Sequence, residues 1–332
     1  MEIEVRLATS LEKKVTLDEK MLSIVIPVLD EEKTIEPLFE KIAAVMAGEK
    51  VTNYEVIFVD DGSCDNSWAV IEKLFNNYPD KVKGIRFRKN FGKSTALSAG
   101  FQEACGDIVV TLDADLQDDP NEIPKLIEKI EAGFDLVSGW KQDRQDSPGK
   151  TLPSKIFNKI TALISGIKLN DFNCGLKAYR REVTEAIKVY GELHRYIPVL
   201  AHEKGFLVGE VPVRHHKRQY GVSKYGLERY ARGFLDLLTV LTITRYLQRP
   251  GHLFGGIGIV SGLFGGGALI YLVVLWFLGY RPIGNRPLLL FGIMAVILSV
   301  QLVSFGLLAE ISIQKQQPQS AESLICMLLK RG

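Results

Sequence analysis

The sequence predicts an α/β fold in which helices sandwich a mostly parallel sheet, followed by long apolar helices near the C-terminus. Three observations lead to this prediction. Short apolar runs rich in β-branched residues alternate with segments of helical length through the first part of the chain. Several of these runs end in carboxylates, as strands do at the ligand edge of an open parallel sheet. The last part of the chain contains two long stretches without a charged residue.

Five segments are predicted strands, because each is a short apolar run of the kind that is buried on both faces of a sheet. They cover residues 22–28, 54–59, 82–87, 107–112 and 134–139. Helices are expected between them, from Thr34 to about residue 47, after Asp65, and over residues 94–104 and 120–132. Thr34 and Asp65 are residue types that cap helices, and Pro120 suits a first helical turn.

Carboxylates follow the first, second and fourth predicted strands. The densest group comprises Asp113, Asp115, Asp118 and Asp119. Because the carboxyl ends of parallel strands meet at one edge of a sheet, we expect a ligand site there. Asp113 and Asp115 could both approach one hard cation such as Mg²⁺ or Mn²⁺. The alternative is a surface acidic turn that caps the helix after Pro120.

Composition narrows the class of protein. The 332 residues leave room for two domains, and a formal net charge of +2 predicts no nucleic-acid partner. The four cysteines are scattered, which is typical of a reducing compartment and predicts no metal or disulfide framework. Residues 1–20 are charged throughout, so we expect a loose arm and no signal peptide. Neither a dinucleotide fingerprint nor a P-loop motif is present.

Five short motifs occur in a fixed order along the chain. They are SIVIPVLDEE at 23–32, VDDGS at 59–63, NFGK at 90–93, DADLQDDP at 113–120 and RQYGVSK at 218–224. Together they resemble the family 2 glycosyltransferases of the GT-A fold, over roughly residues 22–250. The similarity is greatest to polyprenyl-phosphate sugar transferases, namely dolichyl-phosphate mannose synthases and bactoprenol glucosyltransferases.

The resemblance implies roles for individual residues. The implied nucleotide-sugar site comprises Pro27, Leu29, Glu31, Asp61, Asp113 and Ala114, with Asp61 at the base and Asp113 by the ribose. The implied ligands of Mg²⁺ or Mn²⁺ are Asp113, Asp115 and Gln117. Such a metal bridges the diphosphate and neutralises its charge as it leaves. Lys141 stands where relatives often carry arginine, and its role is left open.

Asp171, in the segment NDFNCG, is the candidate catalytic base that the resemblance implies. Inverting transfer requires an acceptor oxygen that is free to attack, and a carboxylate is the usual base. A phosphate acceptor weakens that requirement, because a phosphate monoester is largely dianionic near pH 7. Asp171 could instead cap a helix or orient a neighbouring residue.

Arg218 and Lys224 are the candidate phosphate-binding catalytic residues. They flank a flexible turn with Gly221 and Ser223, and their spacing matches the family, so we expect them to clamp the acceptor phosphate and the donor diphosphate. The alternative is a solvated basic face. The neighbouring pair His215 and His216 has no acidic partner in the sequence, so we expect a structural or interfacial role for it.

Two further helices are expected to be amphipathic. Residues 151–169 carry an apolar stripe, which predicts packing either on the protein's own sheet or on a membrane interface. Residues 225–248 interleave arginine with apolar side chains, a pattern typical of a helix among lipid headgroups.

Residues 253–279 and 288–309 are predicted to form a transmembrane helical hairpin, because each run is long enough to cross a hydrocarbon core of about 30 Å. A buried soluble hairpin is the alternative. Glycine recurs every four residues at Gly258, Gly262 and Gly266, which favours helix contact and a homo-oligomer. The distribution of lysine and arginine predicts that the catalytic domain and both termini are cytoplasmic.

The predicted domains are an arm (1–20), a GT-A glycosyltransferase domain (21–224), a juxtamembrane helix (225–250), two transmembrane helices (251–312) and a cytoplasmic tail (313–332). The expected activity is metal-dependent, inverting transfer of a hexose, with UDP-glucose as the expected donor, to a polyprenyl phosphate. The alternatives are a GDP-mannose-dependent enzyme of the dolichyl-phosphate type, an inert nucleotide-sugar-binding scaffold and a processive polysaccharide synthase. The processive enzymes need more spans and usually a Q-x-x-R-W motif, which the sequence lacks.

Overall fold

The computed structural model describes residues 20–142, 158, 161–162, 165–191, 193–216, 250–280, 282–284 and 286–316. The contacts of the chain divide it into two units, Met1–Leu237 and Leu238–Gly332. The predicted juxtamembrane helix and most of the predicted helix at 151–169 lie outside the described residues.

The first unit is built on a seven-stranded sheet with the strand order β3-β2-β1-β4-β6-β5-β7. The strands are β1 (Leu22–Val28), β2 (Tyr54–Asp60), β3 (Val82–Arg86), β4 (Ile108–Thr111), β5 (Leu136–Lys141), β6 (Lys177–Arg180) and β7 (Val208–Val213). Only β6 runs antiparallel to its neighbours, while the other pairs of strands are parallel. All five predicted strands are confirmed, with ends that differ by one or two residues.

The strands β6 and β7 were not predicted. β6 has four residues, of which two are charged, so no apolar run marks it. β7 pairs with β5 alone and contains Pro212, which an edge strand tolerates because one side of its backbone makes no ladder.

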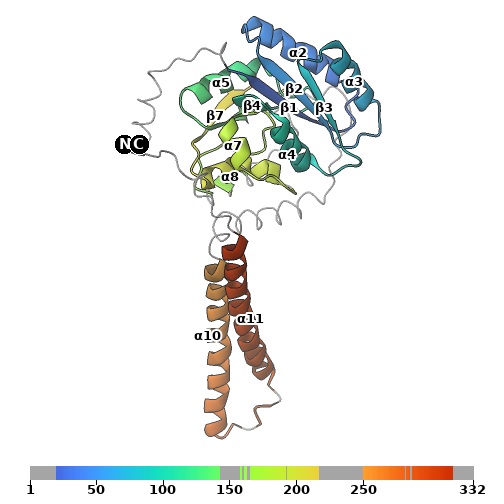
Figure 1. The fold of residues 1–332 in the computed structure, drawn as a ribbon. Coiled ribbons are helices and arrows are strands. Elements are labelled where there is room, and N and C mark those ends of the chain that lie inside the picture. The colour runs from blue at the N-terminus through green and yellow to red at the C-terminus, as the bar shows by residue number, and fades with distance from the viewer. Residues whose placement is uncertain are drawn as a thin grey trace, which may run out of the picture. The chain divides into compact units, whose positions relative to one another are not determined.

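Helices cover both faces of the sheet (Figure 1). On one face lie α2 (Ile35–Gly48), α3 (Ser67–Asn77) and α5 (Ile123–Glu131), and on the other lie α4 (Lys93–Glu103), α7 (Arg181–Ala186) and α8 (Ile197–Glu203). Alternate residues of β1, from Leu22 to Val28, belong to the core that α2, α3 and α5 close. The strands β1, β2 and β4 are buried on both faces, which confirms the predicted α/β sandwich.

Helix ends differ in detail from the predictions. Thr34 is the N-cap residue of α2, but its hydroxyl donates to the carbonyl of Glu31 and caps no amide. Asp65 accepts from the amide of Ser67, although the N-cap of α3 is Asn66. Pro120 begins a short 3-10 turn, η2 (Pro120–Glu122), and Asp119 caps it.

The predicted helix at 151–169 ends earlier than expected. Residues 166–169 are not helical, because Gly166 has φ 73°, a left-handed conformation that ends a helix. The amide of Gly166 donates to the carbonyl of Ala162.

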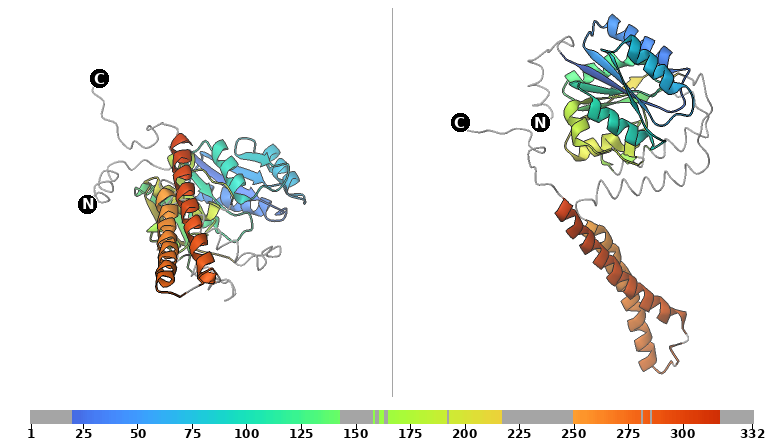
Figure 2. Two further views of the ribbon diagram at one scale, coloured as in Figure 1. Left: turned by 90° about the horizontal axis from the view of Figure 1, so that it is seen from below. Right: turned by 45° about the vertical axis from the view of Figure 1, so that its right-hand side comes forward.

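The second unit contains two long antiparallel helices, α10 (Pro250–Phe277) and α11 (Pro287–Gln316), which lie side by side in both views of Figure 2. Their apolar segments, Leu253–Phe277 and Pro287–Ser312, are long enough to cross a membrane. Only 17% and 11% of their most apolar windows are buried, whereas the core helix of a soluble protein would be mostly buried. Among the residues that the structure describes, α10 and α11 are thus two candidate membrane spans.

Two of the three regularly spaced glycines of α10 face α11. A Cβ atom at Gly258 would lie 2.9 Å from Val303, and one at Gly262 would lie 2.6 Å from the hydroxyl of Ser299. A Cβ atom at Gly266 would have no neighbour within 4 Å beyond its own helix backbone. The glycine spacing is therefore accounted for by close packing within the hairpin. The homo-oligomer stays a prediction.

Candidate active site

The carboxyl ends of β1, β2 and β4 lie next to one another, and the chain turns sharply after two of them. Asp30, after β1, and Leu116, after β4, have left-handed backbones with φ of 54° and 59°. A bulky residue such as leucine rarely adopts this conformation, which costs about 1–3 kcal/mol. The surrounding contacts hold the loop of Asp113–Gln117, the D-x-D loop, in this conformation.

The ends of β1 and β2 are joined by reciprocal hydrogen bonds. The Asp30 carboxylate accepts from the amide of Cys64 at 2.8 Å, and the amide of Asp30 donates to the Ser63 hydroxyl at 2.9 Å. The amide of Glu31 donates to the Ser67 hydroxyl. These bonds fix the backbone beside Pro27, Leu29 and Glu31, the predicted border of the nucleotide.

Asp61 connects β2 to the NFGK segment. One carboxylate oxygen accepts from the amide of Phe91 at 2.7 Å, and the other accepts from the amide of Gly92 at 2.9 Å. Burial raises the pKa of Asp61 although both amide bonds act to lower it. Asp61 is therefore an anchor of the backbone, and its contact with the base stays a prediction.

Asp113 lies at the end of β4 and forms an ion pair with Lys93 at 2.5 Å. A Cβ atom on Gly175 would lie 2.5 Å from the Asp113 carboxylate, so only glycine permits this approach. Ala114, next to Asp113, is buried. Lys93 was part of a recognised motif, but neither its pairing nor the role of Gly175 was predicted.

Asp115 and Gln117 occupy the turn after Asp113. The Asp115 carboxylate accepts from the amide of Gln117 at 3.2 Å. No group of three or more His, Cys, Asp or Glu residues that could hold a metal occurs in the part of the chain that the structure describes. Asp113, Asp115 and Gln117 nevertheless supply oxygen donors, which Mg²⁺ and Mn²⁺ prefer when substrate phosphates and water complete the coordination. The donor types therefore fit a metal that binds together with its substrate.

A buried carboxylate, that of Asp118, anchors the chain directly after the D-x-D loop. Asp118, which is 2% exposed, lies 2.9 Å from the ammonium of Lys141 and 3.6 Å from the imidazole of His215. Burial acts to raise the pKa of Asp118, but Lys141 and His215 hold it well below the usual range. His216 lies 3.1 Å from the Asp119 carboxylate.

The histidine pair therefore has acidic partners in the folded chain, which no neighbouring carboxylate in the sequence indicated. The reason is that the backbone after β7 folds alongside the D-x-D loop: Asp118 and His215 form an isolated antiparallel bridge, and the amide of His216 donates to the carbonyl of Gln117 at 2.8 Å. Arg218 and Lys224 follow shortly after in the sequence, but they lie outside the described residues.

Asp171 is 1% exposed, and its carboxylate accepts from the amide of Asn173 at 3.0 Å. This bond is a turn-stabilising contact of the kind that the sequence left open as an alternative to catalysis. Its catalytic role stays a prediction.

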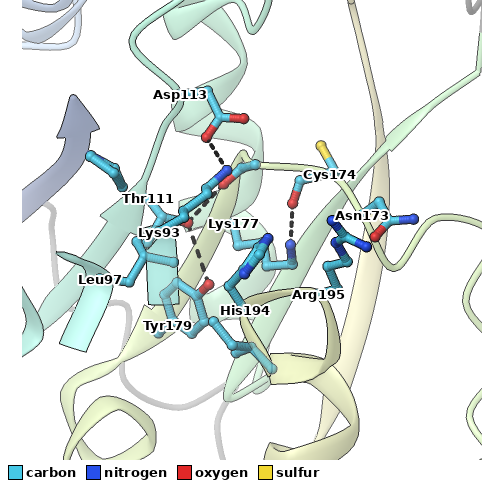
Figure 3. A pocket seen from close by; sticks show the side chains of 13 residues that line it. Lys93, Leu97, Thr111, Asp113, Asn173, Cys174, Lys177, Tyr179, His194 and Arg195 are labelled. Carbon is cyan, nitrogen blue, oxygen red and sulfur yellow. Dashed lines mark hydrogen bonds and ion pairs between the residues drawn. The ribbon is translucent and has the colours of Figure 1, made fainter. Parts of the chain in front are cut away.

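A cavity of about 150 Å³ lies beside Asp113, between α4, the end of β4, β6 and the short turn η3 (Leu193–Tyr196). Figure 3 shows the side chains of Lys93, Lys177, His194 and Arg195 converging on it. The Ser94 hydroxyl and His194 Nδ1 are 3.0 Å apart. Burial and the neighbouring cations hold the pKa of His194 well below its ordinary value, so this imidazole is neutral near pH 7.

This cavity was not predicted. Its polar residues come from segments that carry no recognised motif, apart from Lys93 and Asp113. The basic character of the region around Arg195 was a signal in the sequence, but nothing local showed that it would face Asp113.

The sheet with an acidic D-x-D loop at its carboxyl edge defines the class of protein: an α/β glycosyltransferase of the GT-A type. A model of the family described as glycosyl transferase family 2 matches residues 23–188, and the chain belongs to this family.

Two relatives are similar to the chain over most of its length. It is 38% identical over 293 residues to the dodecaprenyl-phosphate galacturonate synthase of Rhizobium johnstonii, covering 87% of this chain and 86% of the relative. It is 38% identical over 291 residues to the undecaprenyl-phosphate 4-deoxy-4-formamido-L-arabinose transferase of Shewanella sediminis, with coverage of 87% and 86%. The predicted resemblance to polyprenyl-phosphate sugar transferases is confirmed.

Among solved structures, the glucosyl-3-phosphoglycerate synthase of Mycobacterium tuberculosis in complex with Mn²⁺ and UDP-glucose matches with a TM-score of 0.52 and 20% sequence identity. The match covers 72% of this chain and 82% of that one. At this identity the likeness shows the fold alone, and it confirms the GT-A architecture.

Proposed function

We propose that this glycosyltransferase moves a sugar from a nucleoside diphosphate to the phosphate of a polyprenyl lipid. The observation that carries the proposal is the D-x-D loop, which lies at the carboxyl edge between the nucleotide-side turns and a cation-lined cavity. The names of the two relatives, both of which use a polyprenyl phosphate, support the choice of acceptor. The two apolar helices support a lipid substrate, because they would keep the enzyme at the membrane.

In the proposed reaction an oxygen of the lipid phosphate attacks the anomeric carbon as the bond from that carbon to the donor diphosphate breaks. The attack takes place from the opposite face, so the configuration inverts. A divalent metal, Mg²⁺ or Mn²⁺, would offset the charge of the departing diphosphate, with Asp113, Asp115 and Gln117 as its proposed protein ligands. Because the acceptor is already anionic, Asp171 would orient the site more than it would remove a proton.

Arg218 and Lys224 are proposed to bind the two phosphate groups. Arg218 is two residues beyond His216, whose amide is bound to Gln117 of the D-x-D loop. Positive charge at the diphosphate would act most strongly in the transition state.

The proposed orientation places the catalytic domain and both termini in the cytoplasm, where nucleotide sugars are made. It rests on the distribution of lysine and arginine around the two spans. Labelling of Cys64 or Cys105, which are exposed, with a membrane-impermeant thiol reagent tests it. Intact cells should show no labelling of these cysteines. Labelling is expected once the membrane is permeabilised and the reagent reaches the cytoplasm.

The proposed function is tested by incubating the purified full-length protein, in detergent, with a polyprenyl phosphate, Mg²⁺ or Mn²⁺ and each of a panel of nucleotide sugars. We expect one sugar to be transferred and a monoglycosylated lipid phosphate to accumulate. UDP-glucose belongs in the panel as the donor that the sequence predicts, together with GDP-mannose as the alternative. Binding of a nucleotide sugar without turnover would indicate an inert scaffold, and a growing polymer would indicate a processive synthase.

A further inference from the structure

The cavity beside Asp113 is lined by more basic side chains than carboxylates. Lys177 is 3% exposed, and its ammonium donates to the backbone carbonyl of Cys174, a neutral partner. Lys93 also lines the cavity, but it forms its ion pair with Asp113, the carboxylate of the lining. Arg195 adds a further cation, and His194 is neutral.

The charge of Lys177 is costly in this place. Burial, together with repulsion from Lys93, lowers the pKa of Lys177, although Asp171 and Asp113 act to raise it. A buried ammonium whose hydrogen-bond partner is a neutral carbonyl is costly, because that carbonyl replaces only part of the water that is lost. A ligand that brings a negative group to this position would remove much of that cost, whereas a neutral sugar would not.

We propose that the sugar of the donor is a hexuronic acid, and that Lys177 and Arg195 bind its carboxylate. This inference rests on the proposed function and names the substrate class of the same site. A guanidinium matches a carboxylate with two parallel hydrogen bonds, and a nearby ammonium adds a third charge-assisted bond.

The position of the cavity favours the sugar over the phosphates as the source of the anion. Pro27 and Asp113 line it, and both are residues of the proposed donor site. The diphosphate and the lipid phosphate have separate proposed sources of positive charge in the metal, Arg218 and Lys224. The named relatives handle galacturonate in one case and a formamido-arabinose in the other, so relatedness alone does not select an acidic sugar.

The test compares donors that differ only at C6 of the sugar: UDP-glucuronate with UDP-glucose, and UDP-galacturonate with UDP-galactose. The full-length enzyme, with a polyprenyl phosphate and Mn²⁺, is expected to use one of the uronates at least about 10-fold better, in kcat/KM, than its neutral counterpart. Equal use of both members of each pair, or preference for a neutral one, would overturn the inference.

Two variants locate the preference. Lys177→Met is expected to lower kcat/KM for the uronate about 10- to 100-fold while changing the neutral donor little, because the lost bond is charge-assisted. Lys177→Arg should keep most of the preference and Arg195→Gln should weaken it. The matched control is Lys168→Met, an exposed lysine outside the cavity, which should change neither donor. Should Lys177→Met lose activity equally with both donors, the cavity binds a phosphate that they share, and the inference is wrong.

A binding measurement separates this inference from the proposed function. Calorimetric titration of the full-length protein with UDP-glucuronate, UDP-galacturonate and their neutral counterparts needs no lipid acceptor. Tighter binding of a uronate, weakened in Arg195→Gln but retained in Lys168→Met, supports the inference even if no polyprenyl phosphate is glycosylated. Turnover with a neutral donor and no selective uronate binding supports the proposed function and overturns the inference.

Discussion

Single carboxylates of similar appearance in the sequence perform different tasks in the structure. Asp61 binds two backbone amides, Asp118 pairs with Lys141, and Asp119 caps η2 and meets His216. These contacts hold the turns in place around Asp113 and Asp115, which lie where a ligand would bind. Part of the acidic run is therefore a helix-capping turn, as the alternative interpretation proposed, and part of it is the candidate site.

Asp115→Asn is expected to reduce transfer by about 100- to 1,000-fold and to leave the fold intact. The substitution removes a charge that the proposed metal requires, and the side chain is only partly buried. Turnover, and Mn²⁺ binding in the presence of the nucleoside diphosphate, measure the effect. Asp80→Asn, at an exposed position, is the control. Near-full turnover of Asp115→Asn with normal Mn²⁺ binding would refute the metal assignment.

Another buried carboxylate, Glu55, lies at the opposite, amino end of the sheet. Glu55 accepts from the Ser23 hydroxyl at 2.6 Å, the Lys83 ammonium at 2.7 Å and the Cys105 amide at 2.8 Å. Burial acts to raise its pKa, but these partners lower it below the ordinary value. Because the pKa is depressed on folding, the stabilisation is complete above the unfolded pKa of about 4.3 and is lost as the pH falls through the lower folded value.

Glu55→Gln is therefore expected to lower the free energy of unfolding by about 1.5–3 kcal/mol at pH 7, the worth of hydrogen bonds to a charged group. The loss should shrink below about pH 4, because the unfolded wild-type chain then binds a proton at Glu55 and the lowered folded pKa stabilises the protein less. Urea unfolding at pH 7 and pH 3.5 measures both effects. Glu49→Gln, at an exposed position, serves as the control. A loss that is equal at both pH values would show that the charge of Glu55 contributes nothing.

At the scale of elements, the D-x-D loop depends on β5 and on the segment after β7. Lys141, the last residue of β5, and His215, just after β7, both meet Asp118 from outside the loop. Lys141→Met leaves this carboxylate without its main partner, at an expected cost of about 3–5 kcal/mol. It should also weaken Mn²⁺ binding, because Asp115 and Gln117 belong to the same loop.

Lys141→Arg should retain the charge and most of the Mn²⁺ affinity, and the double variant Lys141→Met with Asp118→Asn should recover stability relative to Lys141→Met. Thermal unfolding and Mn²⁺ titration of the wild type, Lys141→Met, Asp118→Asn and the double variant measure this coupling. Additive losses in the double variant would show that Lys141 and Asp118 do not act together.

The RQYGVSK segment is the second element on which the reaction is expected to depend. Lys224→Ala should lower kcat by about 30- to 1,000-fold, since a charge-assisted donor aimed at the leaving diphosphate is worth more in the transition state than in the bound substrate. Arg218→Lys should be partly tolerated, because a lysine keeps the charge but loses the two-pronged geometry. Steady-state kinetics with both substrates varied decide the matter: an unchanged kcat with a raised KM would make these residues simple binding contacts.

The molecule as a whole combines an α/β unit with a hairpin of two apolar helices. A chain that ends after Arg249 should still fold and bind a nucleotide sugar, because the seven strands and their core lie before that residue. It should no longer sediment with membranes, whereas the full-length chain should resist carbonate extraction. Release of the full-length chain by carbonate would show that α10 and α11 do not span the bilayer.

Local features of the sequence determined the first five strands, the helices between them, the D-x-D turn and the two apolar helices. They did so because burial on both faces requires a continuous apolar run, and a span requires a charge-free length. Both signals are contained within the segment that they describe. The helix ends were less accurate, because a residue such as Gly166 ends a helix through its backbone conformation, which composition alone does not specify.

Only the tertiary structure decided which distant residues meet. β6 enters between β4 and β5 as the one antiparallel strand, and its short, charged sequence carries no periodic signal. That insertion brings Gly175 against Asp113 and Lys177 into the cavity. Likewise, Asp118 and His215 are far apart in the sequence and form a bridge only because β7 ends beside the D-x-D loop. Such pairings depend on strand order and register, which are properties of the packed chain, so no local pattern could encode them.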